Sequence, residues 1–445
     1  MRRLIHTPEG VRDIYGQECD KKRYLQRQIE KLLRSYGYQS IETPSFEFFE
    51  VFGKEVGTIA SRNLYKFFDR DGNTLVLRPD FTPSVARAAS MYFAEEPMPI
   101  RLCYAGSVFI NNSSYQGRLK ESTQMGVELL NDDSPQADAE LVALVVSIMK
   151  RAGLQEFQIS IGAADFFRSL VEEAQMQEET VAQLRKLLTI KNRFGAQELI
   201  EKLQLPSHLE EAFRQIPELF GTVDVLAKAR ELTSNEKALL AIERLEKIYE
   251  ILTFYGCQSY VSFDLSLLSN YEYYTGILFQ AYTYGSGDAV IKGGRYDKLL
   301  GKFGKQSPAV GFAVETDALL SAIERQKLPL PLEDIKIMLL YPEKLEQAAI
   351  RWACQWREQN HDVACLRMEA DRSLEDYVSY GRRNQFRTIV QLQSQTQALV
   401  CHLADGSRET LNLEEEPGRS GEHRGHQQSD AVETEGKKGA AACDI

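Results

Sequence analysis

The sequence predicts an α+β fold in which an antiparallel sheet with flanking helices is followed by a small C-terminal α/β domain. Two observations lead to this prediction. Short strand patterns occur in hairpin-like groups before the helical patterns, whereas a doubly wound sheet would alternate strands and helices regularly. A segment that contains Pro329 and Pro331 then separates a second set of elements from the first. We therefore expect domains at 1–325 and 335–413.

The first domain is expected to open with an amphipathic helix at 20–36, where apolar residues recur on one face and Gly37 ends the pattern. Residues 65–77 predict two strands joined at 71–73, where Asp-Gly-Asn tolerates the backbone angles of a tight hairpin. A mostly helical insertion is expected at about 178–232. Further strands are predicted at 100–110, 123–129, 157–161, 273–284 and 289–292, and helices at 137–152 and after Thr316.

The second domain alternates strand and helix patterns, which predicts a small α/β unit that resembles an anticodon-binding domain only loosely. Its strands are predicted at 335–341, 363–367, 388–392 and 398–403, and its helices at 345–359 and 373–380. From residue 414 onward the chain is rich in Gly, Glu, Ser and Lys and has almost no large apolar residues. Such a segment cannot bury a core, so 414–445 is expected to be a disordered tail.

Composition argues against several classes of protein. The formal net charge of -11 opposes long-range attraction to phosphates, so nucleic-acid binding is not expected. The 7 cysteines are scattered, with no CxxC pair and no histidine at ligand spacing, so neither a metal nor a cofactor is expected. The N-terminus lacks the apolar run of a secretory signal, and no segment approaches the roughly 20 apolar residues of a membrane span. We expect a cytoplasmic protein.

Four short stretches carry the functional prediction, and the first is Leu-Arg-Pro-Asp-Phe-Thr at 77–82. In order and spacing the four resemble histidyl-tRNA synthetases, which implies a class II aminoacyl-tRNA synthetase fold over about residues 5–325. In that family the acidic residue of the matching segment holds the amino group of histidine, so Asp80 and Thr82 become candidate histidine-binding residues. An ammonium group that leaves water needs such a carboxylate. The alternative is an ordinary turn with Arg78 in a surface ion pair.

The second stretch, at 106–112 and continuing to 124–128, resembles motif 2 of the class II synthetases. The family's arginine that grips the α-phosphate of ATP falls on Ile110. Isoleucine neither donates a hydrogen bond nor carries charge, so a phosphate would lose its clamp here. The resemblance also places Gln124 and Glu128 in the amino-acid pocket, where they can bind the amino and imidazole groups of histidine.

The third stretch, at 268–279, resembles the family's histidine-binding signature, and Ser269 stands where the family has a catalytic arginine. Tyr274 and Tyr296 are expected to flank the imidazole ring. The glycine pair at 293–294 supports this expectation, because glycines admit a ligand close to the backbone. The neighbouring tyrosine at 273 is assigned to packing within a strand.

The fourth stretch, at 309–319, resembles motif 3 and places Ala318 where the family has an arginine that contacts ATP. Together with Ile110 and Ser269, it makes a third position without the arginine of the synthetases. Losing one donor aimed at transition-state charge costs about 10²- to 10³-fold in rate. We therefore expect no catalytic residue and no enzymatic activity, although the amino-acid pocket is retained.

A chain with this combination resembles the regulatory subunits of ATP phosphoribosyltransferase, as do its segments at 78–82 and 282–288. The resemblance implies a non-catalytic subunit, required by a short catalytic subunit in the first step of L-histidine biosynthesis, with L-histidine as the feedback effector. It also implies dimers within a hetero-octamer. A divergent histidyl-tRNA synthetase and a tRNA-binding synthetase paralogue remain as alternatives, and histidine binding at a subunit interface stays open.

Overall fold

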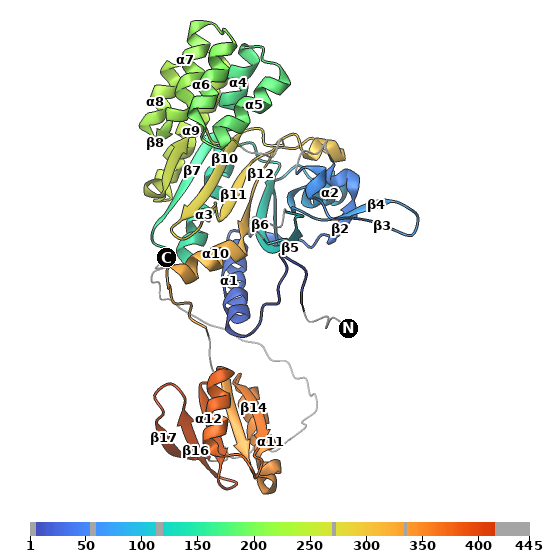
Figure 1. The fold of residues 1–445 in the computed structure, drawn as a ribbon, viewed down its shortest axis with the longest axis vertical. Coiled ribbons are helices and arrows are strands. Elements are labelled where there is room, and N and C mark those ends of the chain that lie inside the picture. Colours follow the sequence, from blue (N-terminus) through green and yellow to red (C-terminus); the bar gives the residue numbers. More distant parts are fainter. Residues whose placement is uncertain (1–5, 54–58, 113–118, 269–272, 333–335, 414–445) are drawn as a thin grey trace, which may run out of the picture. The chain divides into compact units, whose positions relative to one another are not determined.

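The computed structural model describes residues 6–53, 59–112, 119–268, 273–332 and 336–413. The chain forms two compact units, Met1–Leu332 and Glu333–Ile445 (Figure 1). Helices pack on sheets in both units, and the predicted α+β class is confirmed. The segment 414–445, for which a disordered tail is predicted, lies outside the described residues.

The first unit is built on a sheet with the strand order β1-β5-β6-β12-β11-β10-β7-β9-β8. From β5 to β7 every neighbouring pair is antiparallel, whereas β1 joins β5 and β9 joins β7 in parallel. Strand β10 begins at Ile277 and not at the predicted residue 273, which leaves the preceding tyrosines outside the ladder. The strands are β1 Gln39–Ser40, β5 Ile100–Phe109, β6 Glu121–Leu130, β7 Phe157–Ala163, β8 Phe220–Gly221, β9 Val261–Asp264, β10 Ile277–Thr283, β11 Ile291–Arg295 and β12 Ala309–Glu315.

Long helices cover this sheet because each presents an apolar stripe to it. In α1 (Gly16–Ser35) the buried side chains recur at helical spacing, at Leu25, Ile29, Leu32 and Leu33. Helix α3 (Pro135–Arg151) is capped by Ser134, whose side chain accepts a hydrogen bond from the N–H of Ala137. It packs against β7, β10, β11 and β12 and against α9 (Glu236–Phe254), while α10 (Thr316–Arg325) packs against α1 and β6. The main hydrophobic core lies between these helices and the sheet.

A helical region follows β7 and is drawn in green in Figure 1. It contains α4 (Ala164–Glu173), α5 (Glu178–Thr189), α6 (Arg193–Lys202), α7 (Ser207–Gln215) and α8 (Asp224–Glu231). The short strand β8 interrupts it before α8 and pairs with β9, which ties the region to the edge of the large sheet. Within the described ranges, no helix is long and apolar enough to cross a membrane.

A small antiparallel sheet, in the order β2-β4-β3, leads into the site. It consists of β2 (Phe46–Phe48), β3 (Lys66–Phe68) and β4 (Thr74–Leu77), and the last two form the hairpin predicted at 65–77. The turn holds Gly72 at φ +85, a backbone angle that favours glycine. The Asp69 carboxylate accepts hydrogen bonds from the N–H groups of Asp71 and Asn73. Strand β4 then delivers the chain to α2 (Thr82–Tyr92).

The second unit is a five-stranded sheet in the order β14-β13-β15-β16-β17. Along β13 (Lys336–Tyr341) the side chains alternate between two cores: Met338 and Leu340 join α12 (Leu374–Arg383), whereas Leu339 joins α11 (Glu346–Glu358). The other strands are β14 Asp362–Arg367, β15 Thr388–Leu392, β16 Gln397–His402 and β17 Arg408–Asn412. The sequence pattern does not predict the last of these, because four of its five residues are polar and all five are exposed, without an apolar alternation.

Candidate ligand-binding site

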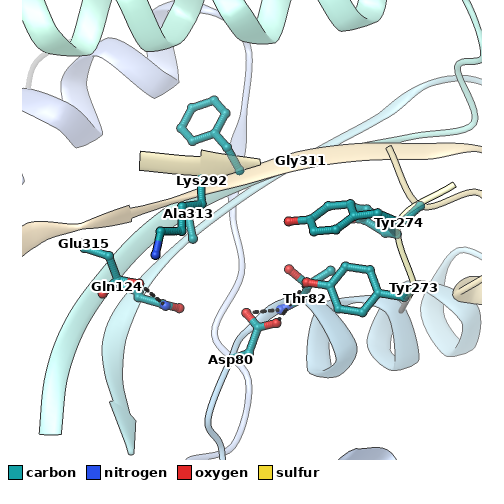
Figure 2. A pocket seen from close by; sticks show the side chains of 11 residues that line it. Asp80, Thr82, Gln124, Tyr273, Tyr274, Lys292, Gly311, Ala313 and Glu315 are labelled. Atoms are coloured by element: carbon teal, nitrogen blue, oxygen red, sulfur yellow. Dashed lines mark hydrogen bonds between the residues drawn. The ribbon is translucent and has the colours of Figure 1, made fainter. Parts of the chain in front are cut away.

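A pocket opens beside the central strands of the large sheet and contains about 400 Å³ of space, including its open mouth. Its walls come from the loop between β4 and α2, from β6, β11 and β12, and from the segment before β10 (Figure 2). All of the predicted histidine-binding residues except Glu128 line it. The lining residues are Asp80, Thr82, Gln124, Tyr273, Tyr274, Lys292, Tyr296, Gly311, Phe312, Ala313 and Glu315.

Asp80 is a buried carboxylate at one end of the pocket, and only 5% of it is exposed. It accepts long hydrogen bonds from the N–H of Thr82, at 3.4 Å, and from the hydroxyl of Tyr273, at 3.3 Å. The first turn of α2 lies next to it, where the helix dipole favours negative charge. Burial nevertheless raises the pKa of Asp80, and among the described residues no cation pairs with it. The carboxylate is therefore short of a positively charged partner.

Gln124 and Glu315 form a pair between neighbouring strands, because β6 and β12 place them directly opposite each other. The amide Nε2 of Gln124 donates to Oε1 of Glu315 at 2.7 Å. Gln124 is buried, and its Oε1 has no hydrogen-bond partner among the described residues. An unpaired buried acceptor costs about 1–3 kcal/mol, so this oxygen favours a ligand that brings an N–H group.

Glu128 lies behind the pocket wall and not in the lining. Its carboxylate accepts hydrogen bonds from the hydroxyls of Thr82, at 2.8 Å, and Tyr296. Burial raises the pKa of Glu128 to about 8, although both hydrogen bonds act in the opposite direction. Gly311 makes room for this carboxylate, because a Cβ at that position would overlap Oε2 of Glu128. Glu128 therefore holds the lining side chains of Thr82 and Tyr296 in place, and their hydroxyl groups donate to Glu128 and not to a ligand.

The tyrosines differ from the prediction in one respect. Tyr273 was assigned to packing within a strand, but it lines the pocket and donates to Asp80. The reason is that β10 begins only after Gly276, so the chain at Tyr273 turns toward the cavity. Its ring centroid lies 4.7 Å from that of Tyr274 and 5.8 Å from that of Tyr296. The three rings form one aromatic wall.

The glycine pair at 293–294 admits the protein's own rings and not a ligand, which corrects the prediction. A Cβ at Gly294 would lie 2.8 Å from the ring of Tyr274 and 2.6 Å from the carbonyl oxygen of Ile277. A Cβ at Gly293 would lie 2.5 Å from the ring of Phe279. Both glycines sit in β11, where Phe279 of the neighbouring strand β10 and Tyr274 from the segment before β10 already fill this space. Their role is to let aromatic side chains pack on the sheet.

Arg78 is not in a surface ion pair, so the alternative interpretation of this stretch is wrong. The side chain is 6% exposed and lies over the ring of Phe81, with its guanidinium carbon 4.0 Å from the ring centroid. It donates to the backbone carbonyl oxygens of Thr43, at 2.7 Å, and Ser107, at 2.8 Å. These contacts fix the loop that carries Asp80.

Comparisons with known proteins agree with this geometry. The family described as histidyl-tRNA synthetase matches residues 10–319. An ATP phosphoribosyltransferase regulatory subunit of Acetivibrio thermocellus is 39% identical over 355 residues, which cover 80% of this chain and 85% of the relative. The chain belongs to this family of regulatory subunits. A second member, from Ruminiclostridium cellulolyticum, is 38% identical over 81% of this chain and 86% of its own length.

A solved structure extends the likeness to three dimensions. It is described as an ATP phosphoribosyltransferase regulatory subunit/histidyl-tRNA synthetase from Bacillus halodurans, and it superimposes with a TM-score of 0.78 at 31% identity. The alignment covers 87% of this chain and 98% of that one. The class II synthetase-like fold predicted from the four stretches is thus confirmed, together with membership of the regulatory-subunit family.

The positions that lack the synthetase arginines in this regulatory-subunit homologue can now be placed. Ile110 follows β5, and its backbone N–H donates to the carbonyl oxygen of Lys120 at 2.9 Å. Ala318 lies in α10 and packs against the main core. Neither side chain belongs to the pocket lining, and Ser269 lies outside the described residues. Among the lining residues the only cation is Lys292, whose Nζ donates to Asp288 at 3.1 Å.

A buried ion pair between Arg295 and Asp138 holds the end of β11 in place. Arg295 precedes Tyr296 in the chain and is 2% exposed. Its Nε and Nη2 donate to Oδ1 of Asp138 at 2.9 and 2.7 Å, and Arg244 donates from Nε to the other oxygen of Asp138 at 2.7 Å. Asp138 lies in α3 and Arg244 in α9, so the pair fixes the end of β11 against both helices.

The sequence prediction missed Lys292 and Glu315 as well as Tyr273. One signal in the sequence points to Glu315: the positions 311, 313 and 315 alternate along a strand and so share one face.

The polar and aromatic side chains that line the pocket determine which ligands it can bind. Carboxylate, amide and hydroxyl acceptors outnumber free donors, and three aromatic rings line one side. Such a pocket fits a ligand with a cationic N–H group and a flat ring.

Proposed function

We propose that this chain is the non-catalytic regulatory subunit that a short ATP phosphoribosyltransferase needs for activity in the first step of L-histidine biosynthesis. Family membership supports the assignment, since the curated relatives carry that name. In this proposal two copies of the chain pair within a hetero-octamer that also contains the catalytic subunits. The complex acts in the cytoplasm, where its nucleotide substrate is found.

The pocket is, in this proposal, the sensor for L-histidine. The observation that carries it is that the carboxylate of Asp80 and the side chain of Gln124, whose buried oxygen has no hydrogen-bond partner among the described residues, both line one aromatic pocket. The ammonium group of histidine would supply the missing positive charge and N–H donors, and its imidazole would lie among Tyr273, Tyr274 and Tyr296. Feedback inhibition requires that histidine bind the less active state of the assembly more tightly than the active state.

Loss of synthetase chemistry is the second part of the proposal. Isoleucine and alanine at 110 and 318 offer no donor to a phosphate, and the one cation in the lining is already paired with Asp288. A divergent histidyl-tRNA synthetase would instead catalyse histidine-dependent exchange between ATP and pyrophosphate, and we expect no exchange. A tRNA-binding paralogue would bind tRNA in a salt-sensitive manner, which the net charge of -11 disfavours.

Co-expression with a short ATP phosphoribosyltransferase from the same source tests the whole proposal. We expect co-purification, with a particle mass by light scattering that fits a hetero-octamer, and catalytic activity that depends on this chain. L-Histidine should inhibit the complex. An Asp80→Asn variant should still activate the catalytic subunit but should require at least about tenfold more histidine for inhibition. Catalytic activity that is the same with and without this chain would refute the proposal.

The matched control is Asp71→Asn, which removes the same charge from an exposed turn of the β3–β4 hairpin. This variant should activate and respond to histidine like the wild type. If the complex is inhibited by histidine and Asp80→Asn responds normally, the sensor lies elsewhere, for example at a subunit interface. In that case the regulatory assignment would stand and the pocket assignment would fail.

A further inference from the structure

The pair formed by Gln124 and Glu315 has a chemical asymmetry. A side-chain amide has one end that donates and one that accepts, whereas an ionised carboxylate only accepts. Glu315 therefore dictates which end of the amide faces it, and the observed bond runs from Nε2 of Gln124 to Oε1 of Glu315. The register of β6 and β12 holds the two residues directly opposite each other.

The other end of the amide, the oxygen Oε1, then faces the pocket. Figure 2 shows Gln124 between Glu315 and the space in front of Asp80, with its oxygen on the side away from Glu315. That oxygen is buried without a hydrogen-bond partner among the described residues, and Gln124 itself is only 6% exposed. A side chain held in this way presents an acceptor, not a donor, to whatever enters.

We propose that Glu315 is a positioning residue, which fixes the amide of Gln124 so that its carbonyl oxygen receives an N–H of the ligand's ammonium group beside Asp80. The inference rests on the proposed histidine site and assigns one more residue to its specificity. The class of ligand is a primary amine that carries a positive charge. A compound with the same ring but without the amine gains nothing from this arrangement.

Two neighbours of Glu315 favour its accepting role, although burial opposes it. Burial is the largest influence and raises the pKa of Glu315, but the bond from Gln124 and the positive charge of Lys292 both act to keep the carboxylate ionised. Lys292 lines the same pocket and is held by Asp288. If the amide of Gln124 turned over, Glu315 would lose the donor that it now has, and the amide oxygen would lie against the carboxylate, acceptor against acceptor.

Calorimetric titration of the full chain with L-histidine and with imidazolepropionate, which lacks the amino group, tests the assignment. Glu315→Gln keeps the shape of the side chain, but a glutamine can donate or accept, so it no longer dictates how Gln124 turns. We expect the affinity for L-histidine to fall at least about tenfold, while the weak or absent binding of imidazolepropionate stays unchanged. Glu156→Gln, at an exposed position, is the matched control and should bind like the wild type.

Exchange of the two residues separates positioning from mere packing. In the double variant Gln124→Glu with Glu315→Gln, the new glutamine donates to the new glutamate, whose second oxygen again faces the pocket as an acceptor. We expect its histidine affinity to return to within about threefold of the wild type, a recovery that a purely structural role would not produce. Wild-type affinity in Glu315→Gln, or no recovery in the exchanged variant, would overturn the inference about Glu315 and would leave the sensor proposal standing. A wild-type chain that binds no histidine, by itself or in the complex, would overturn the sensor proposal and this inference with it.

Discussion

Replacing Asp80 by asparagine should stabilise the empty protein and weaken its binding of histidine. The carboxylate is 5% exposed and has two hydrogen bonds longer than 3.2 Å, from Thr82 and Tyr273. Burial raises its pKa above the ordinary value of 3.8, so the folded state holds the proton more tightly than the unfolded chain. The stability that this group contributes is fully present below the unfolded pKa and is lost as pH rises through the folded pKa.

At pH 7.5 the folded protein therefore carries the cost of a buried carboxylate that lacks a cation. A neutral amide removes that cost, which we set at about 1–2 kcal/mol from the usual range for poorly satisfied buried groups. The melting temperature should then rise by roughly 2–5 °C. Histidine should lose a charge-assisted hydrogen bond worth about 1.5–3 kcal/mol, which corresponds to about 10- to 150-fold in affinity.

Thermal unfolding followed by circular dichroism and titration calorimetry with L-histidine measure the two effects on the same preparation. The exposed-turn variant Asp71→Asn should change neither by more than about 0.5 kcal/mol. An Asp80→Asn protein that melts lower than the wild type and binds histidine equally well would show that Asp80 has a structural role. The reasoning from its missing positive partner would then be wrong.

Three further substitutions test the packing around the pocket. Because burial raises the pKa of Glu128 from 4.5 to about 8, the free energy of unfolding should fall as pH rises from about 4.5 to about 8. Glu128→Gln should flatten that slope and exceed the wild type by at least about 1 kcal/mol at pH 9, as urea unfolding at pH 6 and 9 would measure. Arg295→Met removes one of the two arginines that bind the buried carboxylate of Asp138 and should cost about 3–5 kcal/mol in urea; a loss below about 1 kcal/mol would contradict this. Gly311→Ala should cost about 1–3 kcal/mol because its Cβ overlaps the carboxylate of Glu128, whereas Gly287→Ala, which meets nothing within 4 Å, should stay within about 0.5 kcal/mol; equal melting temperatures for the two would refute the steric argument.

Much of the fold and of the pocket could be predicted because it is written in short, local patterns. The helix at α1 shows its buried face as a period in the sequence, and the β3–β4 hairpin shows its turn as Asp-Gly-Asn. Asp80, Thr82 and Gln124 belong to stretches whose order resembles a known family, and the structure brings them to one cavity. For these features local sequence was sufficient.

The remainder depends on contacts between distant strands, which single-sequence patterns do not report. Glu315 enters the pocket because β12 pairs with β6 in one register, and a shift of one residue would turn it to the other face. Arg295 and Asp138 are 157 positions apart, and neither shows its partner in its neighbours. The sequence pattern predicts a strand at Tyr273, but β10 begins only at Ile277, so Tyr273 lies in the segment before the strand and faces the pocket.

The polar groups that line the pocket argue for the kind of ligand it takes, independently of the arginines that are absent at 110 and 318. Asp80 is a buried carboxylate that accepts only two long hydrogen bonds and has no cationic partner among the described residues, and the buried oxygen of Gln124 has no donor there. The hydroxyls of Thr82 and Tyr296 already donate their hydrogen bonds to Glu128. A phosphate would add more acceptors and more negative charge to this set, and each would be left unpaired. An ammonium group supplies what the set lacks. The buried acceptors that cost free energy in the folded chain therefore also make the pocket selective, and a cationic amine would offset that cost by binding.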